Sequence, residues 1–208
     1  HQFLIRIFGR IYLLYLNDMF SSQDQQKIYV ISGPSGVGKD TLMEELSKRN
    51  SDLHIAITAT TRPPRSLELN AVNHYFYDVN EFKKLIRKNE LLEWAEVYGN
   101  FYGLPKSEIS NNINRGKKIL VRVDVQGASR LKELIPQAIY IFISPESEDD
   151  LRSRLNLRHE DSPVEIEARI SRSRSELDEA GWFDFIIVNY SNQINDSVEE
   201  LSRIIRLK

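Results

Sequence analysis

The chain has 208 residues, a length that suits one domain with inserted subdomains. Hydrophobic residues make up 41% of the chain, which is enough for a sizeable core. The 28 Lys and Arg residues nearly balance the 30 Asp and Glu residues, so the net charge of −2 gives no reason to expect a nucleic-acid polymer as partner. The absence of cysteine excludes disulfides, thiolate metal sites and cysteine nucleophiles. This composition is typical of a soluble cytoplasmic enzyme.

The first 26 residues differ from the rest of the chain. An apolar stretch over 3–16 is interrupted by two arginines and a glycine, and it is shorter than the roughly 20 apolar residues of a membrane-spanning helix. No membrane association is therefore expected, although an organellar targeting segment is one interpretation. The favoured interpretation is a disordered or non-native extension, 1–26, because Met19 offers a natural first residue. The domain is predicted to span 27–207.

A glycine-rich turn follows the first predicted strand, 28–32, and leads into a predicted helix, 41–49. The spacing G-x4-G-K lets the backbone curl with its N–H groups pointing inward, which forms an anion-binding nest at a helix N-terminus. Lys39 adds a positive charge for the outer phosphates of a nucleoside triphosphate. The predicted triphosphate-binding residues are Gly33, Pro34, Ser35, Gly36, Val37, Gly38, Lys39, Asp40 and Thr41.

The loop departs from the usual pattern at the residue after its lysine. Ser or Thr is usual there, whereas this chain has Asp40 and a hydroxyl only at Thr41. A carboxylate is a hard oxygen ligand, so Asp40 could hold Mg²⁺ directly or through water. We therefore predict Mg²⁺ as the cofactor and Asp40 as a metal ligand.

Two arginines follow the next predicted strand, 55–60, on a stiffened segment. Arg62 and Arg65 are separated by two prolines, and proline fixes its own φ and restrains the residue before it. Two guanidinium groups held in this way can bind one phosphate dianion at little entropic cost.

Residues 58–106 interrupt the regular alternation of strands and helices. Short strand signals lie at 74–77, 91–98 and 101–104, and a helix is predicted over 80–88. This pattern indicates a small mixed α/β subdomain inserted into the main fold.

The rest of the chain returns to the alternation of an α/β protein. Its near-continuous apolar strands suit a parallel sheet covered on both faces, so a three-layer α/β fold with a central parallel sheet is predicted. Residues 147–176 are dense in arginine and are predicted to form a helical lid, on which Arg152 and Arg172 are expected to be solvated. Strands are predicted over 119–124, 138–143 and 185–189, and helices over 107–115, 128–134, 148–157, 164–179 and 197–207.

Four segments in this order, GPSGVGK, TATTRPPR, ELLEWAEVYGNFYG and VDVQG, resemble guanylate kinase, a family of nucleoside monophosphate kinases in the P-loop NTPase superfamily. The resemblance covers about residues 27–207. It implies a P-loop fold whose insert binds GMP and whose lid closes on ATP. It also implies transfer of the ATP γ-phosphoryl group to GMP or dGMP, giving ADP and GDP, with Mg²⁺ and as a monomer or homodimer.

The resemblance assigns roles to residues at matching positions. The family pattern has a second phosphate-binding tyrosine at a set distance after the arginines, and Tyr75 is the residue assigned to it. Tyr75 lies one residue farther from Arg65 than that pattern gives, and His74 occupies the expected position. The implied catalytic residues are Lys39, Arg62, Arg158 and Arg169, the last two on the lid. Arg154 and Asn189 fall near the adenine of ATP. The implied GMP-binding residues are Thr58, Arg62, Arg65, Tyr75, Glu93, Tyr102 and Asp124.

The chemistry of guanine supports Glu93 independently of the resemblance. Guanine presents N1–H and the exocyclic N2–H₂ as adjacent donors, and a carboxylate can accept both hydrogen bonds. Adenine presents a bare acceptor at N1, which would face the carboxylate unpaired. A polar site of this kind can discriminate between ligands by roughly 10⁴.

Two departures from the family pattern involve charge. Asp40 adds an acid beside the phosphate loop, whereas Arg122 replaces the acid often found two residues before Asp124. We expect these two changes to compensate each other.

Two other functions stay open at this stage. The Gly-Lys-Asp ending of the loop also resembles ribose 1,5-bisphosphate phosphokinases. Guanylate-kinase-like domains of scaffold proteins bind phosphopeptides without catalysis, but such domains often lose the phosphate loop that is intact here.

Overall fold

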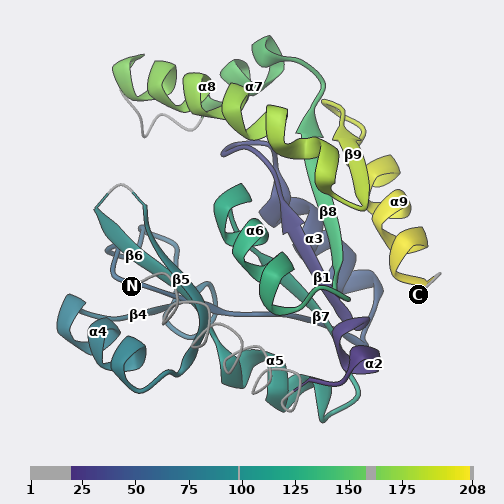
Figure 1. The fold of residues 1–208 in the computed structure, drawn as a ribbon. Helices are drawn as coiled ribbons and strands as arrows, with labels where there is room; N and C mark the ends of the chain where they lie inside the picture. The colour runs from purple at the N-terminus through teal and green to yellow at the C-terminus, as the bar shows by residue number, and fades with distance from the viewer. Residues whose placement is uncertain (1–19, 98, 158–162, 207–208) are drawn as a thin grey trace, which may run out of the picture.

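The computed structural model describes residues 20–97, 99–157 and 163–206. Its centre is a five-stranded sheet in the order β2-β7-β1-β8-β9, and every pair of neighbouring strands is parallel. The strands point toward the phosphate loop and the lid helices (Figure 1). These strands are β1 (Ile28–Ser32), β2 (Leu53–Ile55), β7 (Lys118–Arg122), β8 (Ile139–Pro145) and β9 (Phe185–Asn189).

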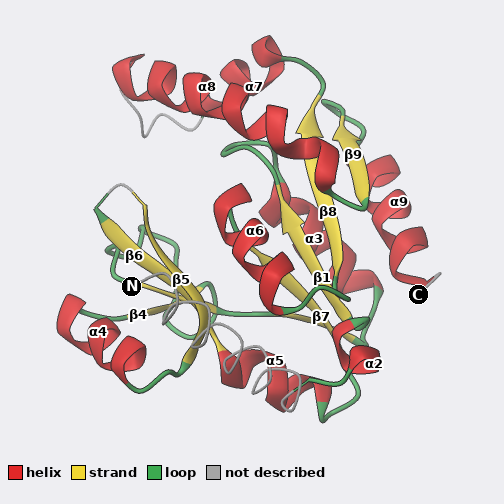
Figure 2. Cartoon of the chain, viewed as in Figure 1, coloured by secondary structure: helices red, strands yellow, loops and turns green. Residues whose placement is uncertain are grey.

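Helices cover both faces of this sheet, which confirms the predicted three-layer fold (Figure 2). Alternate residues of β1 enter different cores because successive side chains of a strand point to opposite faces. Tyr29 and Ile31 pack toward one pair of helices, whereas Ile28 and Val30 pack toward the other. The first pair is α3 (Lys39–Arg49) and α9 (Ile194–Arg206), and the second is α5 (Lys106–Ile113) and α6 (Val125–Leu134).

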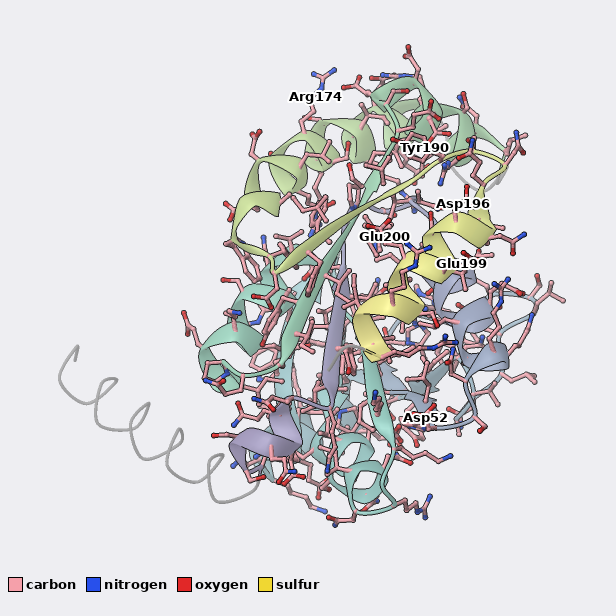
Figure 3. All side chains as sticks on the ribbon, turned by 90° about the vertical axis from the view of Figure 1, so that its right-hand side faces the viewer. Asp52, Arg174, Tyr190, Asp196, Glu199 and Glu200 are labelled. Atoms are coloured by element: carbon pink, nitrogen blue, oxygen red, sulfur yellow. The ribbon has the colours of Figure 1, made fainter. Side chains whose placement is uncertain are left out.

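The C-terminal helix α9 shows how the sequence pattern sets these layers. Its buried side chains recur at helical spacing and include Val198 and Leu201. Glu199 and Glu200 lie on its outer face (Figure 3), where their charges stay in water.

The insert forms a second sheet in the order β4-β3-β6-β5, in which β3 and β4 are parallel and the other pairs antiparallel. A capping box between Asp78 and Glu81 starts its helix. The mixed α/β subdomain predicted over 58–106 is therefore present. It contains β3 (Thr58–Thr60), β4 (His74–Phe76), α4 (Val79–Arg87), β5 (Leu91–Val97) and β6 (Asn100–Pro105).

The single strand predicted over 55–60 is wrong, because the chain passes between the two sheets within it. The Ala56 N–H still donates to the Leu120 carbonyl, 2.9 Å away, beside the central sheet. The Ile57 N–H instead donates to the carboxylate of Glu108 at 3.1 Å. This side-chain acceptor satisfies the backbone at the crossing, so β2 ends in one sheet and β3 begins the other.

The lid consists of α7 (Glu148–Asn156) and α8 (Pro163–Asp178), which pack together. Arg152 forms ion pairs with Glu148 and Glu167 on the surface of this pair, as expected for a solvated charge.

Residues 20–26 belong to the fold, so the prediction of a disordered extension is wrong for them. Phe20 is 1% exposed and packs in the core beside α5 and α6. Gln25, in the short helix α2 (Ser22–Gln25), accepts a hydrogen bond from the Gln137 backbone at 3.2 Å. The rest of the predicted extension, 1–19, lies outside the described residues. Within the described ranges, no helix is both long and apolar enough to cross a membrane.

Candidate active site

A cleft of about 320 Å³ lies between the phosphate loop, the insert and the lid helix α8. It brings together residues from four separate parts of the chain, which meet because the carboxyl ends of parallel strands share one edge of the sheet. The predicted site residues that line it are Gly33, Ser35, Lys39, Asp40, Thr58, Arg62, Arg65, Glu93, Tyr102, Asp124 and Arg169.

The phosphate loop curls as predicted. Gly33, Gly36 and Gly38 all have positive φ, and Gly38 (φ 97°) is the N-cap of α3. The first N–H groups of a helix have no partner within it, so the start of α3 offers amide donors to an anion. Thr41 is exposed and is not among the residues that line the cleft.

Gly33→Ala should strongly destabilise the protein. A Cβ at Gly33 would press into the carbonyl oxygen of Ile143, and its φ of +135° is rarely adopted by other residues. We expect a loss of about 3 kcal/mol or more in the free energy of unfolding, measured in urea. Gly116→Ala is the matched control, because Gly116 also has positive φ (75°) but open space around it, and it should cost only about 1 kcal/mol. Equal losses in the two variants would contradict this account.

Lys39 is held over the loop by its own backbone. Its Nζ donates to the carbonyls of Gly33 at 2.6 Å and Pro34 at 2.9 Å. Burial lowers the pKa of Lys39 to about 8, although Asp40 and Glu176 act in the opposite direction. The ammonium group is therefore charged at neutral pH but loses its proton at modestly alkaline pH.

The affinity for ATP should consequently fall as the pH rises through about 8. A pKa of about 8 means that Lys39 of the free protein is protonated below that pH and neutral above it, and only the protonated form attracts phosphate. We expect a loss approaching tenfold per pH unit above about 8, measured by ATP titration between about pH 7.5 and 9.5. Lys39→Arg stays charged over this range and should show no such fall. A flat wild-type profile would contradict the assignment.

Arg62 holds a carboxylate in the cleft. Its Nη1 and Nη2 donate to Glu68 at 2.9 and 2.8 Å, and the Arg65 backbone N–H donates to the same carboxylate at 2.8 Å. Burial opposes ionisation of Glu68, but these hydrogen bonds outweigh it and lower the pKa of Glu68 to about 2. The bidentate geometry is the one with which arginine binds phosphate. Sequence reasoning missed Glu68, although it lies only three residues after Arg65.

The structure does not bring Tyr75 to the cleft, so its assignment is corrected. The Tyr75 phenol donates to Glu108 at 2.7 Å, and this hydrogen bond and burial raise the pKa of Tyr75 to about 12. His74, its neighbour on β4, points the other way and lines the cleft. Its Nδ1 lies 2.8 Å from the Thr58 hydroxyl. His74, which occupies the position where the family pattern has its tyrosine, is therefore the residue that faces the site.

Glu93 lines the cleft and is 8% exposed. Burial raises its pKa, against the opposing effect of Arg130, whose Nη2 donates to Glu93 at 3.1 Å. Arg130 lies on α6, and no local motif joins it to Glu93, so sequence reasoning missed it. Glu93, Ala95 and Val97 line the cleft from alternate positions of β5, whereas Glu96 is exposed and outside it.

The lid helix contributes more than predicted. Arg172 lines the cleft and donates to Asp124 at 3.0 Å, so its expected role as a solvated charge is wrong. Arg169, Arg172 and Glu176 share one face of α8 at spacings of three and four residues, a periodicity that could have identified the set. Asp124 also caps α6 by accepting the Gly127 N–H at 2.7 Å. Arg158 lies outside the described residues.

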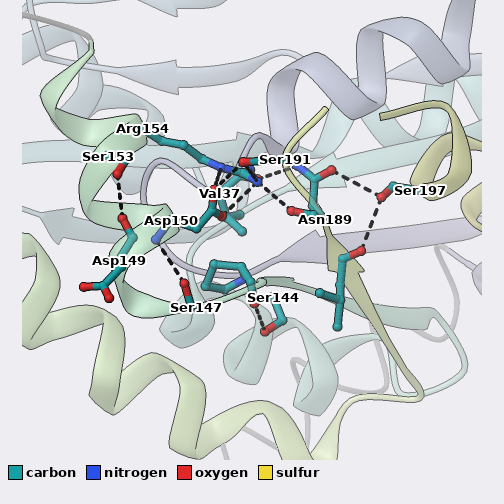
Figure 4. A network of polar contacts seen from close by, with 12 residues as sticks. Val37, Ser144, Ser147, Asp149, Asp150, Ser153, Arg154, Asn189, Ser191 and Ser197 are labelled. Atoms are coloured by element: carbon teal, nitrogen blue, oxygen red, sulfur yellow. Dashed lines mark hydrogen bonds and ion pairs between the residues drawn. The ribbon is translucent and has the colours of Figure 1, made fainter. Parts of the chain in front are cut away.

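The residues predicted near the adenine form a network behind the phosphate loop (Figure 4). Arg154 donates to the carbonyls of Val37 at 3.0 Å and Asn189 at 2.6 Å. The Asn189 amide also donates to Val37, at 2.8 Å. The network ties α7 and the end of β9 to the loop, and neither side chain lines the cleft.

Asp40 pairs with Arg122, so the two charge departures noted in the sequence contact each other. Asp40 remains 54% exposed as a side chain and faces the cleft, where a metal ion could reach it. Among the described residues, no group of three His, Asp or Glu side chains is arranged to hold a metal ion.

The family model described as guanylate kinase matches residues 25–208. The chain belongs to the guanylate kinase family. A guanylate kinase from Prochlorococcus marinus subsp. pastoris is 39% identical over 181 residues, which are 87% of this chain and 97% of that protein. One from Syntrophomonas wolfei is 39% identical over 178 residues, 86% of this chain and 90% of that protein.

The similarity of this chain to guanylate kinases extends to the three-dimensional structure. The crystal structure of guanylate kinase from Anaplasma phagocytophilum matches with a TM-score of 0.71 and 30% identity, over 86% of this chain and 84% of that one. The match and the family assignment confirm the α/β fold predicted from the guanylate kinase motifs.

Proposed function

We propose that this chain transfers the γ-phosphoryl group of ATP to GMP, giving ADP and GDP. One observation carries the proposal: Lys39, Arg62 and Glu93, from the phosphate loop, β3–β4 segment and β5, line a single cleft. Phosphoryl transfer needs positioning and charge neutralisation more than a covalent nucleophile. A chain without cysteine can therefore carry this reaction with cations alone.

On the ATP side, the loop amides and Lys39 bind the phosphates. The Lys39 ammonium exchanges its bonds to the Gly33 and Pro34 carbonyls for phosphate oxygens, which are stronger, charged acceptors. Arg154 and Asn189 hold the loop from behind and border the adenine.

On the GMP side, Arg62, Arg65 and Tyr102 bind the phosphate, and Glu93 and Thr58 bind the guanine. The phosphate takes the place of Glu68 on Arg62, since a dianion is the stronger partner of a guanidinium fork. The guanine donor edge takes the place of Arg130 on Glu93. Neither contact uses the ribose 2′-hydroxyl, so dGMP is also a substrate.

Mg²⁺ fits the residues present. It favours one or two carboxylates together with substrate phosphates, and Asp40 and Asp124 both line the cleft. When bound, the ion would neutralise charge on the transferred phosphoryl group. Asp40, the more exposed of the two, would hold it.

The insert and the lid close on the two nucleotides. Arg169 already faces the cleft from α8, so closure brings its charge onto the phosphates. The same movement excludes water, so that the phosphoryl group passes to GMP rather than hydrolysing.

A substrate panel tests the proposal. ATP is supplied with GMP, dGMP, AMP, UMP or ribose 1,5-bisphosphate, and ADP release is followed in a coupled assay. We expect turnover with the two guanine monophosphates. Preference for ribose 1,5-bisphosphate would assign the sugar kinase activity instead, and binding of a phosphopeptide without any turnover would assign a scaffold module.

A further inference from the structure

Arg122 joins the two halves of the cleft. It is the last residue of β7 and lies opposite Ile31 of β1, the strand that leads into the phosphate loop. One guanidinium nitrogen, Nη1, pairs with Asp40 in the first turn of α3. The other, Nη2, lies 3.2 Å from Nε2 of His74 in the insert.

Neither partner holds Arg122 strongly. The Asp40 side chain is 54% exposed, and ion pairs with exposed carboxylates are worth only about 0–1 kcal/mol. The His74 contact is a hydrogen bond to a neutral ring, because Arg122 can only donate and Nε2 must therefore accept. The other ring nitrogen, Nδ1, then carries the proton and donates to Thr58.

A phosphoryl group would be a stronger partner. Its oxygens are charged acceptors that match the planar fork of arginine, whereas Asp40 and His74 each occupy a single nitrogen. Arg122 lines the same cleft as Lys39 on one side and Arg62 on the other. The phosphoryl group in transit must pass between the sites of these two cations.

We infer that Arg122 is a catalytic residue that binds the phosphoryl group as it passes between the two nucleotides. In the free protein it neutralises Asp40 and rests against His74, and phosphate binding draws it away from both. The inference rests on the proposed function and adds a cation at a position where relatives often carry an acid.

The competing explanation is that Arg122 only offsets the charge of Asp40. A double-mutant cycle separates the two explanations. If Arg122 only neutralises Asp40, its removal has no further effect on kcat once the Asp40 charge is also removed. If Arg122 contacts phosphate directly, its removal lowers kcat whether or not Asp40 is charged.

The cycle uses Arg122→Gln, Asp40→Asn and the double variant. We expect Arg122→Gln to lower kcat by about 10²–10³-fold, as loss of a donor to the transferred group does, and to lower it by a similar factor in the Asp40→Asn background. Without divalent metal, Arg122→Gln should also bind a guanosine–adenosine pentaphosphate at least about tenfold more weakly, by the same lost contact. GMP alone should bind nearly as well as to the wild type.

Arg203→Gln is the matched control, since Arg203 faces the exposed Glu199 at 3.8 Å on α9 and should leave kcat unchanged. Thermal unfolding of each variant checks the fold, and Arg122→Lys, which keeps the charge but loses the fork, should give an intermediate kcat. Recovery of the double variant to the Asp40→Asn rate, or an unchanged kcat in Arg122→Gln, would overturn the inference. A wild-type protein inactive on GMP would instead overturn the proposed function.

Discussion

Lys39→Met lowers kcat by about 10²–10³-fold or more, because the substitution removes a preorganised cation from the phosphate loop. The Gly33 and Pro34 carbonyls already hold the Lys39 ammonium over the loop, so only a local exchange of hydrogen bonds precedes its contact with phosphate. Methionine is similar in length to lysine but carries no charge, so the variant fills the same space without a buried cation. Steady-state kinetics with ATP and GMP measure the effect.

Lys48→Met is the control for this prediction. Lys48 lies on the same helix, α3, but its side chain is 66% exposed and pairs with Glu45 on the surface. Lys48→Met should leave kcat within about twofold of the wild-type value, since surface substitutions away from a site have small effects. A Lys39→Met enzyme as active as Lys48→Met would contradict the role given to the loop.

Glu93→Gln should lower kcat/KM for GMP by about 10³-fold and largely remove the preference for GMP over AMP. The amide keeps one acceptor oxygen but turns its NH₂ group toward one of the guanine N–H groups. Two buried donors then face each other, and neither has an acceptor. Glu93 is 8% exposed, and water cannot easily supply the missing acceptor. The kcat/KM values for both monophosphates measure the change.

The matched control for Glu93 is Glu96→Gln on the same strand. Glu96 is exposed and does not line the cleft, so it carries the same charge change outside the site. It should leave the GMP preference intact. Retained preference in Glu93→Gln, with normal thermal stability, would mean that other groups recognise the guanine.

The parts of the site that depend on local chain geometry could be predicted from the sequence. The phosphate loop needs only a strand, a glycine turn and a helix in succession, and β1, Gly38 and α3 follow that order. Arg62 and Arg65 likewise lie on one stiffened segment that lines the cleft.

The partners of these residues could not be predicted, because they come from distant segments. Arg130 reaches Glu93 from α6, and Arg172 reaches Asp124 from the lid. A single charged residue on a helix resembles a solvated charge until the fold shows what faces it. The expectation for Arg172 failed for this reason.

The exchange of Tyr75 for His74 has a simpler cause. Side chains alternate across a strand, so a shift of one residue moves the predicted contact to the opposite face. On β4 that opposite face carries Tyr75 to Glu108 and away from the cleft. Counting along the motif cannot decide between two neighbouring residues that both suit the chemistry.

The free protein shows a common arrangement at its charged groups. Arg62 holds Glu68, Glu93 holds Arg130 and Asp124 holds Arg172. Each of these three proposed ligand-binding charges thus has an opposite charge in place, which a phosphate or a guanine donor edge would replace. Such exchange avoids leaving a charge desolvated without a partner, which is costly.

The most direct test of the account is a crystal structure of the complex with GMP and a non-hydrolysable ATP analogue. We predict that the guanine N1–H and N2–H₂ groups lie within hydrogen-bond distance of the Glu93 carboxylate. The GMP phosphate should occupy the fork of Arg62 in place of Glu68. GMP bound elsewhere, with Arg62 still on Glu68 and Arg130 still on Glu93, would contradict the account.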